Sequence, residues 1–197
     1  MAISVYKTLP TLRGTLASVG PWAGYFARSG WRVYPYRLGA QIRNDLTNNT
    51  QIDTHGMGDI AANNYLMVCS RTAYGAGHLY IPQTSQITRC TTIGTADDEI
   101  NVNPAMTVTA GDYLFNLGND GASAPLSAPS YDGSPIGLYT DPAGNNSAGD
   151  YLVTGTNGEF SGYIDEGYPS VDLLIVDSSG VPRAMLAGFT PGASVGV

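Results

Sequence analysis

The segment from Pro135 to Gly180 constrains the fold most, because short apolar runs alternate in it with strong turn signals. The turns between the runs are built from Asn, Gly, Asp and Pro, which tolerate positive φ or preset the first corner of a turn. Strands about ten residues apart with such turns are typical of antiparallel β-sandwiches and barrels. The last run is almost wholly apolar, which predicts a strand covered on both faces. The runs are residues 136–140, 150–154, 159–164 and 171–176.

The order of these motifs resembles small β-sandwich modules of tailed-bacteriophage structural proteins. In that family an incoming strand ends in a Tyr-x-Asp-x-x-Gly turn, found here at residues 139–144, and a Thr-Asn-Gly-x-Phe turn follows, found here at residues 156–160. The resemblance extends from Gly111 to Gly180, and it implies a β-sandwich in a virion, as part of a fibre, a baseplate or a capsid decoration. It implies no catalytic residue. The insertion of Pro169-Ser170 departs from the family's tight turn before the closing strand and changes the length of one loop.

Composition supports a turn-rich β-protein of one or two domains. Of 197 residues, 25 are Gly and 12 are Pro, while only 13% are charged, about half the usual share. No run of 18 apolar residues is present, so no membrane span is expected. The N-terminus lacks the apolar stretch of a signal peptide, and we therefore expect synthesis in the host cytoplasm followed by assembly into a virion. The best helix candidate is the short segment 40–46.

The charge is distributed very unevenly along the chain. Residues 1–44 contain six basic and no acidic residues, a net charge of +6, whereas residues 45–197 contain three basic and 16 acidic residues, a net charge of −13. Such asymmetry indicates an interaction surface. The basic segment also carries six aromatic residues between positions 22 and 36, including both tryptophans. Aromatic residues and Arg dominate the energetics of protein interfaces.

Three hypotheses compete for this basic segment. It could fold back as a loop on its own domain, dock as an arm on an acidic partner, or form a groove for single-stranded nucleic acid. We favour docking, because Gly and Pro interrupt the segment and because the acidic remainder, with an overall pI of 4.5, disfavours nucleic acid. The expected partner-binding residues are Trp22, Tyr25, Phe26, Arg28, Trp31, Arg32, Tyr34, Tyr36 and Arg37.

The predicted fold class is therefore all-β, with antiparallel β-sandwich or barrel domains preceded by an extended, irregular N-terminal arm. We place this docking arm at residues 1–59 and a first β region at residues 60–117. A linker at residues 118–133 follows, since it lacks any strand signal. The phage-type β-sandwich occupies residues 134–197, and its strands and turns look locally complete enough to fold without the arm.

No motif in the sequence predicts catalysis, a cofactor or a metal site. Cys69 and Cys90 lie 21 residues apart without zinc-ligand spacing, so they are expected to be buried thiols or, alternatively, a disulfide. The Asp- and His-containing loop 53–59 is more typical of a solvent-facing turn than of a metal site. A calcium site at Asp141, Asn145 and Asp150 is conceivable, but EF-hand spacing is absent. The Gly-x-Ser-x-Gly match at 192–196 leaves no room for the helix that a nucleophile elbow requires.

Two functions remain, both non-enzymatic. The first is a capsid decoration or cement protein that binds the outer shell through its arm, with the major capsid protein or another virion protein as partner. The second is a tail-fibre, baseplate or head-fibre adhesion module that binds a host surface glycan. We prefer the first because a glycan binder should concentrate exposed aromatics on its sandwich loops, whereas here they lie in the arm. A homo-oligomer is expected in either case, and a tail-tube or connector role cannot be separated from the first by sequence.

Overall fold

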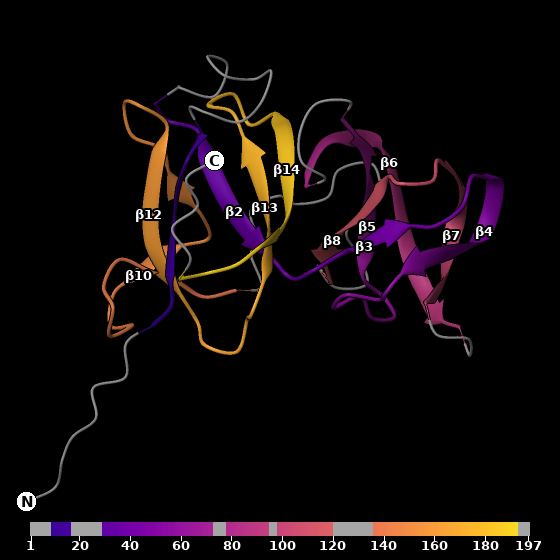
Figure 1. Cartoon of the computed structure of the whole chain (residues 1–197), viewed down its shortest axis with the longest axis horizontal. Helices are drawn as coiled ribbons and strands as arrows, with labels where there is room; N and C mark the ends of the chain where they lie inside the picture. The colour runs from indigo at the N-terminus through magenta and orange to yellow at the C-terminus, as the bar shows by residue number, and fades with distance from the viewer. Residues whose placement is uncertain (1–8, 17–28, 73–77, 95–97, 120–135, 193–197) are drawn as a thin grey trace, which may run out of the picture.

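The computed structural model describes residues 9–16, 29–72, 78–94, 98–119 and 136–192 of the chain. These residues form an all-β structure without an α-helix, as the sequence predicts. Fourteen strands build two lobes that lie side by side (Figure 1). We call them the barrel lobe and the sandwich lobe.

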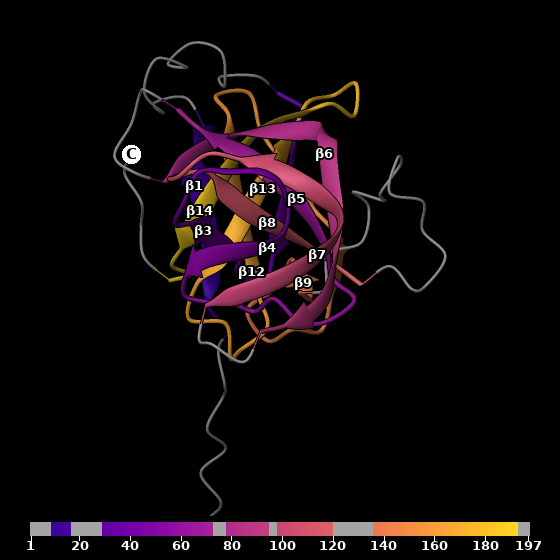
Figure 2. The same ribbon diagram turned by 90° about the vertical axis from the view of Figure 1, so that its right-hand side faces the viewer.

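The barrel lobe is a closed antiparallel barrel of six strands that follow one another along the chain. The order β6-β5-β8-β3-β4-β7 is closed by pairing of β7 with β6, so no strand edge is left open. Figure 2, which looks onto this lobe, shows the strands curving around a common centre. The strands are β3 (Ala40–Ile42), β4 (Leu46–His55), β5 (Tyr65–Arg71), β6 (Leu79–Ile93), β7 (Glu99–Val108) and β8 (Tyr113–Gly118).

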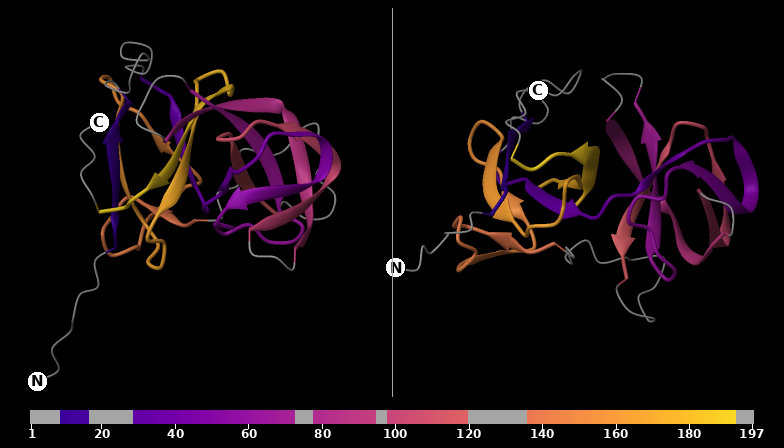
Figure 3. Two further views of the ribbon diagram at one scale, coloured as in Figure 1. Left: turned by 45° about the vertical axis from the view of Figure 1, so that its right-hand side comes forward. Right: turned by 60° about the horizontal axis from the view of Figure 1, so that its bottom comes forward.

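The sandwich lobe packs a four-stranded sheet, of order β1-β12-β9-β10, on the sheet segment β11-β2-β13-β14. β14 also pairs with β6, through Met185–Tyr80 and Leu186–Leu79, so one ten-stranded sheet continues from the sandwich into the barrel. The two lobes, which lie side by side in both views of Figure 3, are therefore joined by a sheet as well as by the chain. The strands are β1 (Thr11–Thr15), β2 (Arg32–Tyr36), β9 (Leu138–Tyr139), β10 (Ser147–Gly149), β11 (Leu152–Val153), β12 (Glu159–Ile164), β13 (Val171–Val176) and β14 (Pro182–Phe189).

Alternation of side chains along the central strands produces three apolar layers. In β13, Leu173 and Ile175 face the sandwich core, while Leu174 and Val176 face the barrel lobe. Every residue of β13 is buried, which confirms the prediction of a strand covered on both faces. The side chains of β5 alternate in the same way: Leu66 belongs to the barrel core, whereas Tyr65 and Met67 belong to the layer between the lobes. The layer between the lobes, the interlobe layer, comprises Tyr34, Tyr36, Tyr65, Met67, Cys69, Tyr80, Ile87, Tyr113, Phe115, Leu117, Leu174, Val176, Met185 and Ala187.

The described part of the predicted N-terminal arm is not irregular but consists of strands. β1 and β2 belong to the sandwich lobe, and β3 and β4 belong to the barrel lobe. Pro35 pairs with Leu173 of β13 on one side of β2, and the short neighbour β11 on the other side pairs with Arg32 and Val33. The boundary at residue 59 is therefore replaced by a boundary near residues 37–39, where the chain passes from one lobe to the other.

Two further predictions about local structure are wrong. The helix candidate 40–46 is strand β3 and the turn after it, because Ala40 and Ile42 alternate into the barrel core and tertiary packing overrides a weak propensity. Within the predicted first β region, the sequence favours two separate strands near residues 77–82 and 87–93, but the structure has one long strand there, β6, which contains Pro82. A register shift in β5 between Met67 and Cys69, where Pro82 pairs, accommodates that proline. Most of the predicted linker, from residue 120 onward, lies outside the described residues.

Candidate functional site

The predicted partner-binding residues divide into three groups. Three aromatic side chains are buried inside the protein, with exposed fractions of 8% for Trp31, 1% for Tyr34 and 0% for Tyr36. Arg32 is half-buried and Arg37 is exposed. The remaining residues, Trp22, Tyr25, Phe26 and Arg28, lie outside the described residues.

Trp31 belongs to the sandwich core, where it packs with Val33 and Leu152. Its backbone is fixed by Thr154, because the Trp31 N–H donates to Thr154 Oγ1 at 3.0 Å and the Thr154 N–H donates to the Trp31 carbonyl at 2.8 Å. A side chain held in this way cannot reach a partner while the lobe stays folded. For Trp31, burial therefore favours the alternative in which the segment folds back on its own domain.

Tyr34 and Tyr36 belong to the interlobe layer. The Tyr36 ring meets Phe115 of the barrel lobe at 4.9 Å between centroids, in an edge-on arrangement, and the Tyr34 ring meets Tyr151 at 5.1 Å. Both geometries are within the range in which aromatic pairs attract one another. The two tyrosines therefore hold the sandwich to the barrel and are corrected here from partner-binding to structural residues.

The arginines of the basic segment are also used within the chain. The Arg32 guanidinium lies 5.0 Å from the centre of the Tyr151 ring, which permits a cation–π contact. Arg43 forms a salt bridge of 3.0 Å with Asp98 on the barrel lobe. Arg37 contacts Tyr168, with its guanidinium 5.8 Å from the ring centre and one nitrogen 3.5 Å from the hydroxyl oxygen. Each of these three arginines therefore contacts another described residue of the same chain.

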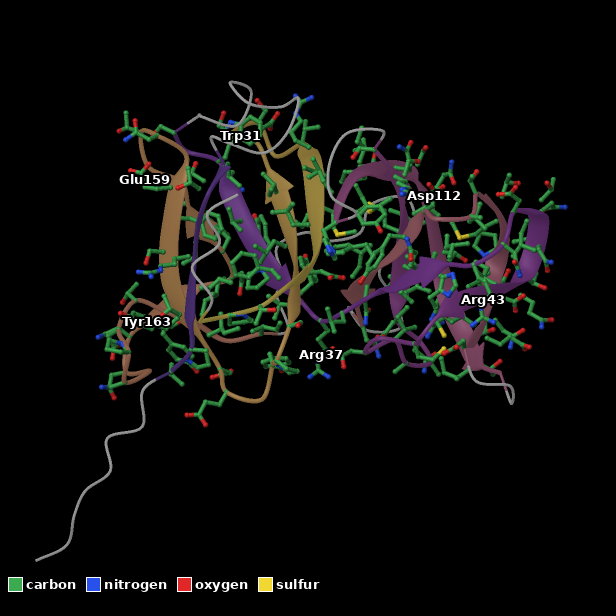
Figure 4. The ribbon with its side chains drawn as sticks, in the orientation of Figure 1. Trp31, Arg37, Arg43, Asp112, Glu159 and Tyr163 are labelled. Atoms are coloured by element: carbon green, nitrogen blue, oxygen red, sulfur yellow. The ribbon has the colours of Figure 1, made fainter. Side chains whose placement is uncertain are left out.

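Arg37, which Figure 4 shows at the boundary between the lobes, lines a groove that we call the interlobe groove. Its volume is about 660 Å³, within the range typical of ligand sites. One wall is the connection between the lobes together with Asp59 of the barrel lobe, and the other is the β12–β13 loop. The lining residues are Leu9, Arg37, Leu38, Asp59 and residues 165–170.

Backbone hydrogen bonds fix the wall of the groove that carries Arg37. The Leu38 N–H donates to Asp59 Oδ2 at 3.1 Å, and the Asp59 N–H donates to the Leu38 carbonyl at 2.9 Å. On the opposite wall, the Asp165 N–H donates to the Gly137 carbonyl at 3.2 Å. The Asp165 carboxylate also accepts a hydrogen bond from Tyr139, which raises the pKa of the Tyr139 hydroxyl. Both walls are thus held in place before any ligand arrives.

Asp172, in the middle of β13, forms a polar junction beneath this region. Its side chain is fully buried and accepts hydrogen bonds from the N–H groups of Gly39 at 2.8 Å and Gly188 at 2.9 Å, and from the Tyr113 hydroxyl at 3.3 Å. The carboxylate therefore ties the connection between the lobes to both β8 and β14. Desolvation by burial raises the pKa of Asp172 to about 6, although the three hydrogen bonds oppose the shift. The sequence signal for this junction was a single Asp within an apolar strand, and it was overlooked.

The two cysteines are free and buried. Cys69 belongs to the interlobe layer and Cys90 to the barrel core, so they point to different sides of the sheet. Burial raises the pKa of both thiols, with the nearby Asp172 carboxylate adding to the effect at Cys69. Neither side chain therefore has the thiolate character that a reactive cysteine needs.

The conceivable calcium loop is organised by its own hydrogen bonds. The Asp141 carboxylate accepts the backbone N–H groups of Ala143 at 3.0 Å, Asn145 at 3.3 Å and Asn146 at 2.7 Å. Desolvation raises the pKa of Asp141, but these hydrogen bonds to the carboxylate outweigh it, and the pKa is lowered overall. The carboxylate thus closes a turn, as Asp commonly does. Within the described ranges, no group of three or more His, Cys, Asp or Glu side chains could hold a metal ion.

Comparison of the chain with protein-family models, with curated proteins and with solved structures finds no match. The resemblance to phage structural proteins therefore rests on the sequence motifs alone. Among the described residues, no helix is long and apolar enough to cross a membrane.

Proposed function

We propose that the protein is a non-enzymatic structural component of a tailed-phage virion, a decoration or cement protein that binds the major capsid protein or another virion protein. The proposal is supported by the phage-type order of strands and turns from Gly111 to Gly180. It is also supported by the all-β fold with a continuous sheet, which suits a rigid part of an assembly.

The burial of Trp31, Tyr34 and Tyr36 narrows the docking surface to the segment 17–28. This segment connects β1 with β2, and its two ends are anchored in the sandwich lobe. Leu16 is buried in the sandwich core, and the Gly30 N–H donates to the Thr154 carbonyl at 2.9 Å. The observation that carries the proposal is this anchoring, because a basic and aromatic segment held at both ends loses less entropy on docking than a free arm. The expected docking residues are now Trp22, Tyr25, Phe26 and Arg28.

The same observation favours a second candidate, an adhesion module of a fibre or baseplate that binds a host glycan. A glycan-binding sandwich is expected to carry exposed aromatics on its loops. Since β1 and β2 are strands of the sandwich, the segment 17–28 between them is a sandwich connection and not a separate arm. The sequence analysis argued against adhesion because the aromatic residues lay in an arm and not on a sandwich loop. Once the segment 17–28 is a connection between two sandwich strands, that argument against adhesion is lost.

The experiment that tests docking compares Trp22→Ala and Arg28→Ser with the unaltered protein for occupancy on purified capsids and for melting temperature. A hot-spot tryptophan contributes about 2–4 kcal/mol, so we expect Trp22→Ala to weaken attachment by roughly 30-fold to 1000-fold. Melting should be almost unchanged, because the loss falls on assembly. Arg28→Ser should weaken attachment in low salt and flatten its salt dependence.

Capsid occupancy that neither variant changes would remove the cement hypothesis. Loss of binding to host cells or to a glycan array in Trp22→Ala, with no binding to capsids by either protein, would establish the adhesion alternative instead. Trp31→Ala is the matched control, because its tryptophan is buried in the same lobe and its loss should appear in melting.

A further inference from the structure

β1 is an edge strand, because it ends the four-stranded sheet and pairs only with β12 among the described strands. The left view of Figure 3 shows it, in indigo, on the side of the sandwich lobe away from the barrel lobe. In an antiparallel pair, every second residue exchanges backbone hydrogen bonds with the neighbouring strand. Pro10 and Leu16, at the two ends of β1, bond to the β12 side, the first through its carbonyl and the second through its N–H. The even-numbered residues between them therefore also bond to β12, and the backbone groups of Thr11, Arg13 and Thr15 point to the open side.

One of these outward groups is already bonded to the C-terminal part of the chain. The Gly192 N–H donates to the Thr11 carbonyl at 2.6 Å, so the chain reaches the first residue of β1 just before the segment 193–197 begins. Within the described part of the chain, no hydrogen bond uses the backbone N–H or carbonyl of Arg13 or Thr15 on this side. A strand edge with unpaired backbone groups is a template for a further strand.

The segment 193–197 has the sequence of a short strand. In Ala-Ser-Val-Gly-Val, apolar residues alternate with Ser and Gly, and the segment contains neither a charged residue nor proline. At about 3.3 Å per residue, five extended residues span roughly 16 Å, enough to run along the five residues of β1. Starting at Thr11, the segment can follow β1 only in the same direction, because an antiparallel course would lead it away from Arg13 and Thr15.

We propose that residues 193–197 add to the open edge of β1 as a parallel strand and bond to the outward backbone groups of Arg13 and Thr15. The small sheet then has a fifth strand, and these groups are no longer available to a strand of another chain. Because β1 leads directly into the segment 17–28, the added strand also steadies the N-terminal anchor of that segment. The inference depends on the open edge alone, so it holds for a capsid decoration and for a fibre module.

Amide hydrogen exchange, measured by NMR, tests the proposal on the unaltered protein and on the double variant Ser194→Pro/Val195→Pro. Neighbouring N–H groups of a strand point to opposite sides, so the double change removes whichever of the two faces β1. We expect the Arg13 and Thr15 amides to be protected in the unaltered protein and to exchange roughly tenfold faster in the variant, because each loses a hydrogen bond.

The Leu12 and Gly14 amides are the internal control, because they bond to β12 and should keep their protection in both proteins. If the variant also frees these two amides, β1 itself has loosened, and crosslinking of proteins with an unbroken segment decides instead.

Crosslinking shows whether the segment lies along β1 as a strand and from which chain it comes. Thr15→Cys is combined in turn with Ser194→Cys and with Val195→Cys, and each pair is treated with a short bismaleimide. Cys69 and Cys90 are buried and should not react while the protein is folded. Since neighbouring residues of a strand point to opposite faces, one pair should crosslink within the chain roughly tenfold faster than the other.

The proposal is overturned if the Arg13 and Thr15 amides exchange at the same rate in both proteins, or if the two cysteine pairs crosslink equally fast or not at all. A covalent dimer would also overturn it, because the added strand would then belong to a second copy. Faster exchange confined to Arg13 and Thr15, together with one preferred crosslink within the chain, supports it.

Discussion

The barrel lobe and the sandwich lobe differ in how the chain supplies their strands. All six barrel strands lie in one continuous stretch, from Ala40 to Gly118, and closure leaves no open edge. The sandwich lobe takes β1 and β2 from before the barrel and six further strands from after it. The barrel is thus an insertion between two parts of the sandwich. A lobe whose strands are far apart in sequence depends on distant contacts, and a lobe of consecutive strands does not.

The lobes also differ in chemistry from the layer between them. Both cores are mainly aliphatic, whereas the interlobe layer contains five tyrosines, Tyr34, Tyr36, Tyr65, Tyr80 and Tyr113. A tyrosine buries a large apolar ring while its hydroxyl keeps a polar partner. Tyr113 shows this directly, since its ring lies in the layer and its hydroxyl donates to Asp172. We therefore expect the two lobes to unfold together, as one cooperative unit.

The largest expected effect comes from separating the two parts of the sandwich. The sequence predicts that the sandwich at residues 134–197 folds without the arm, but even a longer fragment of residues 105–197 lacks β2, which lies between β11 and β13, and β1, which pairs with β12. We now expect no cooperative thermal transition, because the sandwich core loses Trp31, Val33, Leu12 and Leu16. Circular dichroism with heating measures this.

The fragment 38–119 is the matched comparison, because it contains all six barrel strands. We expect it to unfold cooperatively, although its exposed interlobe face should make it self-associate. A cooperative transition in residues 105–197 would show instead that the sandwich does not need its N-terminal strands.

The next largest effect is expected from truncating one buried side chain in each lobe. Trp31→Ala in the sandwich core should reduce the free energy of unfolding by about 3–5 kcal/mol, and Leu114→Ala in the barrel core by about 2–5 kcal/mol. Since the sheet continues through both lobes, each variant should shift one common transition in urea. Two separate transitions, with each variant moving only one, would contradict the coupling of the lobes.

The smallest expected effect concerns the pH dependence that Asp172 adds at the junction. Its pKa in the folded protein is about 6, above the ordinary value of 3.8, so the folded state keeps a proton that the unfolded state releases. The resulting stabilisation is complete below pH 3.8 and is lost as the pH rises through about 6, a change of about 3 kcal/mol. The measurement is urea unfolding of the protein and of Asp172→Asn between about pH 4 and pH 7.

The free energy of unfolding of the protein minus that of Asp172→Asn should fall by about 3 kcal/mol as the pH rises from about 4 to about 7. Asp141 and Asp177, whose pKa values are lowered, contribute with the opposite sign, but they are present in both proteins and cancel. Cys69, Tyr113 and Asp59 also face the junction and are unchanged in the variant. Parallel curves would mean that Asp172 does not titrate in this range.

Part of the fold was predictable because its signals are local. The turns at 139–144 and 156–160 and the apolar run of β13 specify strands whatever surrounds them, and they gave the all-β class correctly. The location of the groove had no such signal. Arg37 and Tyr168 are 131 residues apart and meet only because β2 pairs with β13.

The amino-acid sequence by itself determined the strand-rich class, the uneven charge and the clustering of aromatics near the N-terminus, since these follow from composition and from patterns of a few residues. Only the tertiary structure decided what those aromatics do. The same residue types that make an interface hot spot also make a core, and the choice depends on whether a neighbouring strand is present to cover them. For Trp31, Tyr34 and Tyr36, most of the residues that cover the ring lie beyond position 110. Burial against these distant strands is favourable because it removes a large apolar ring from water.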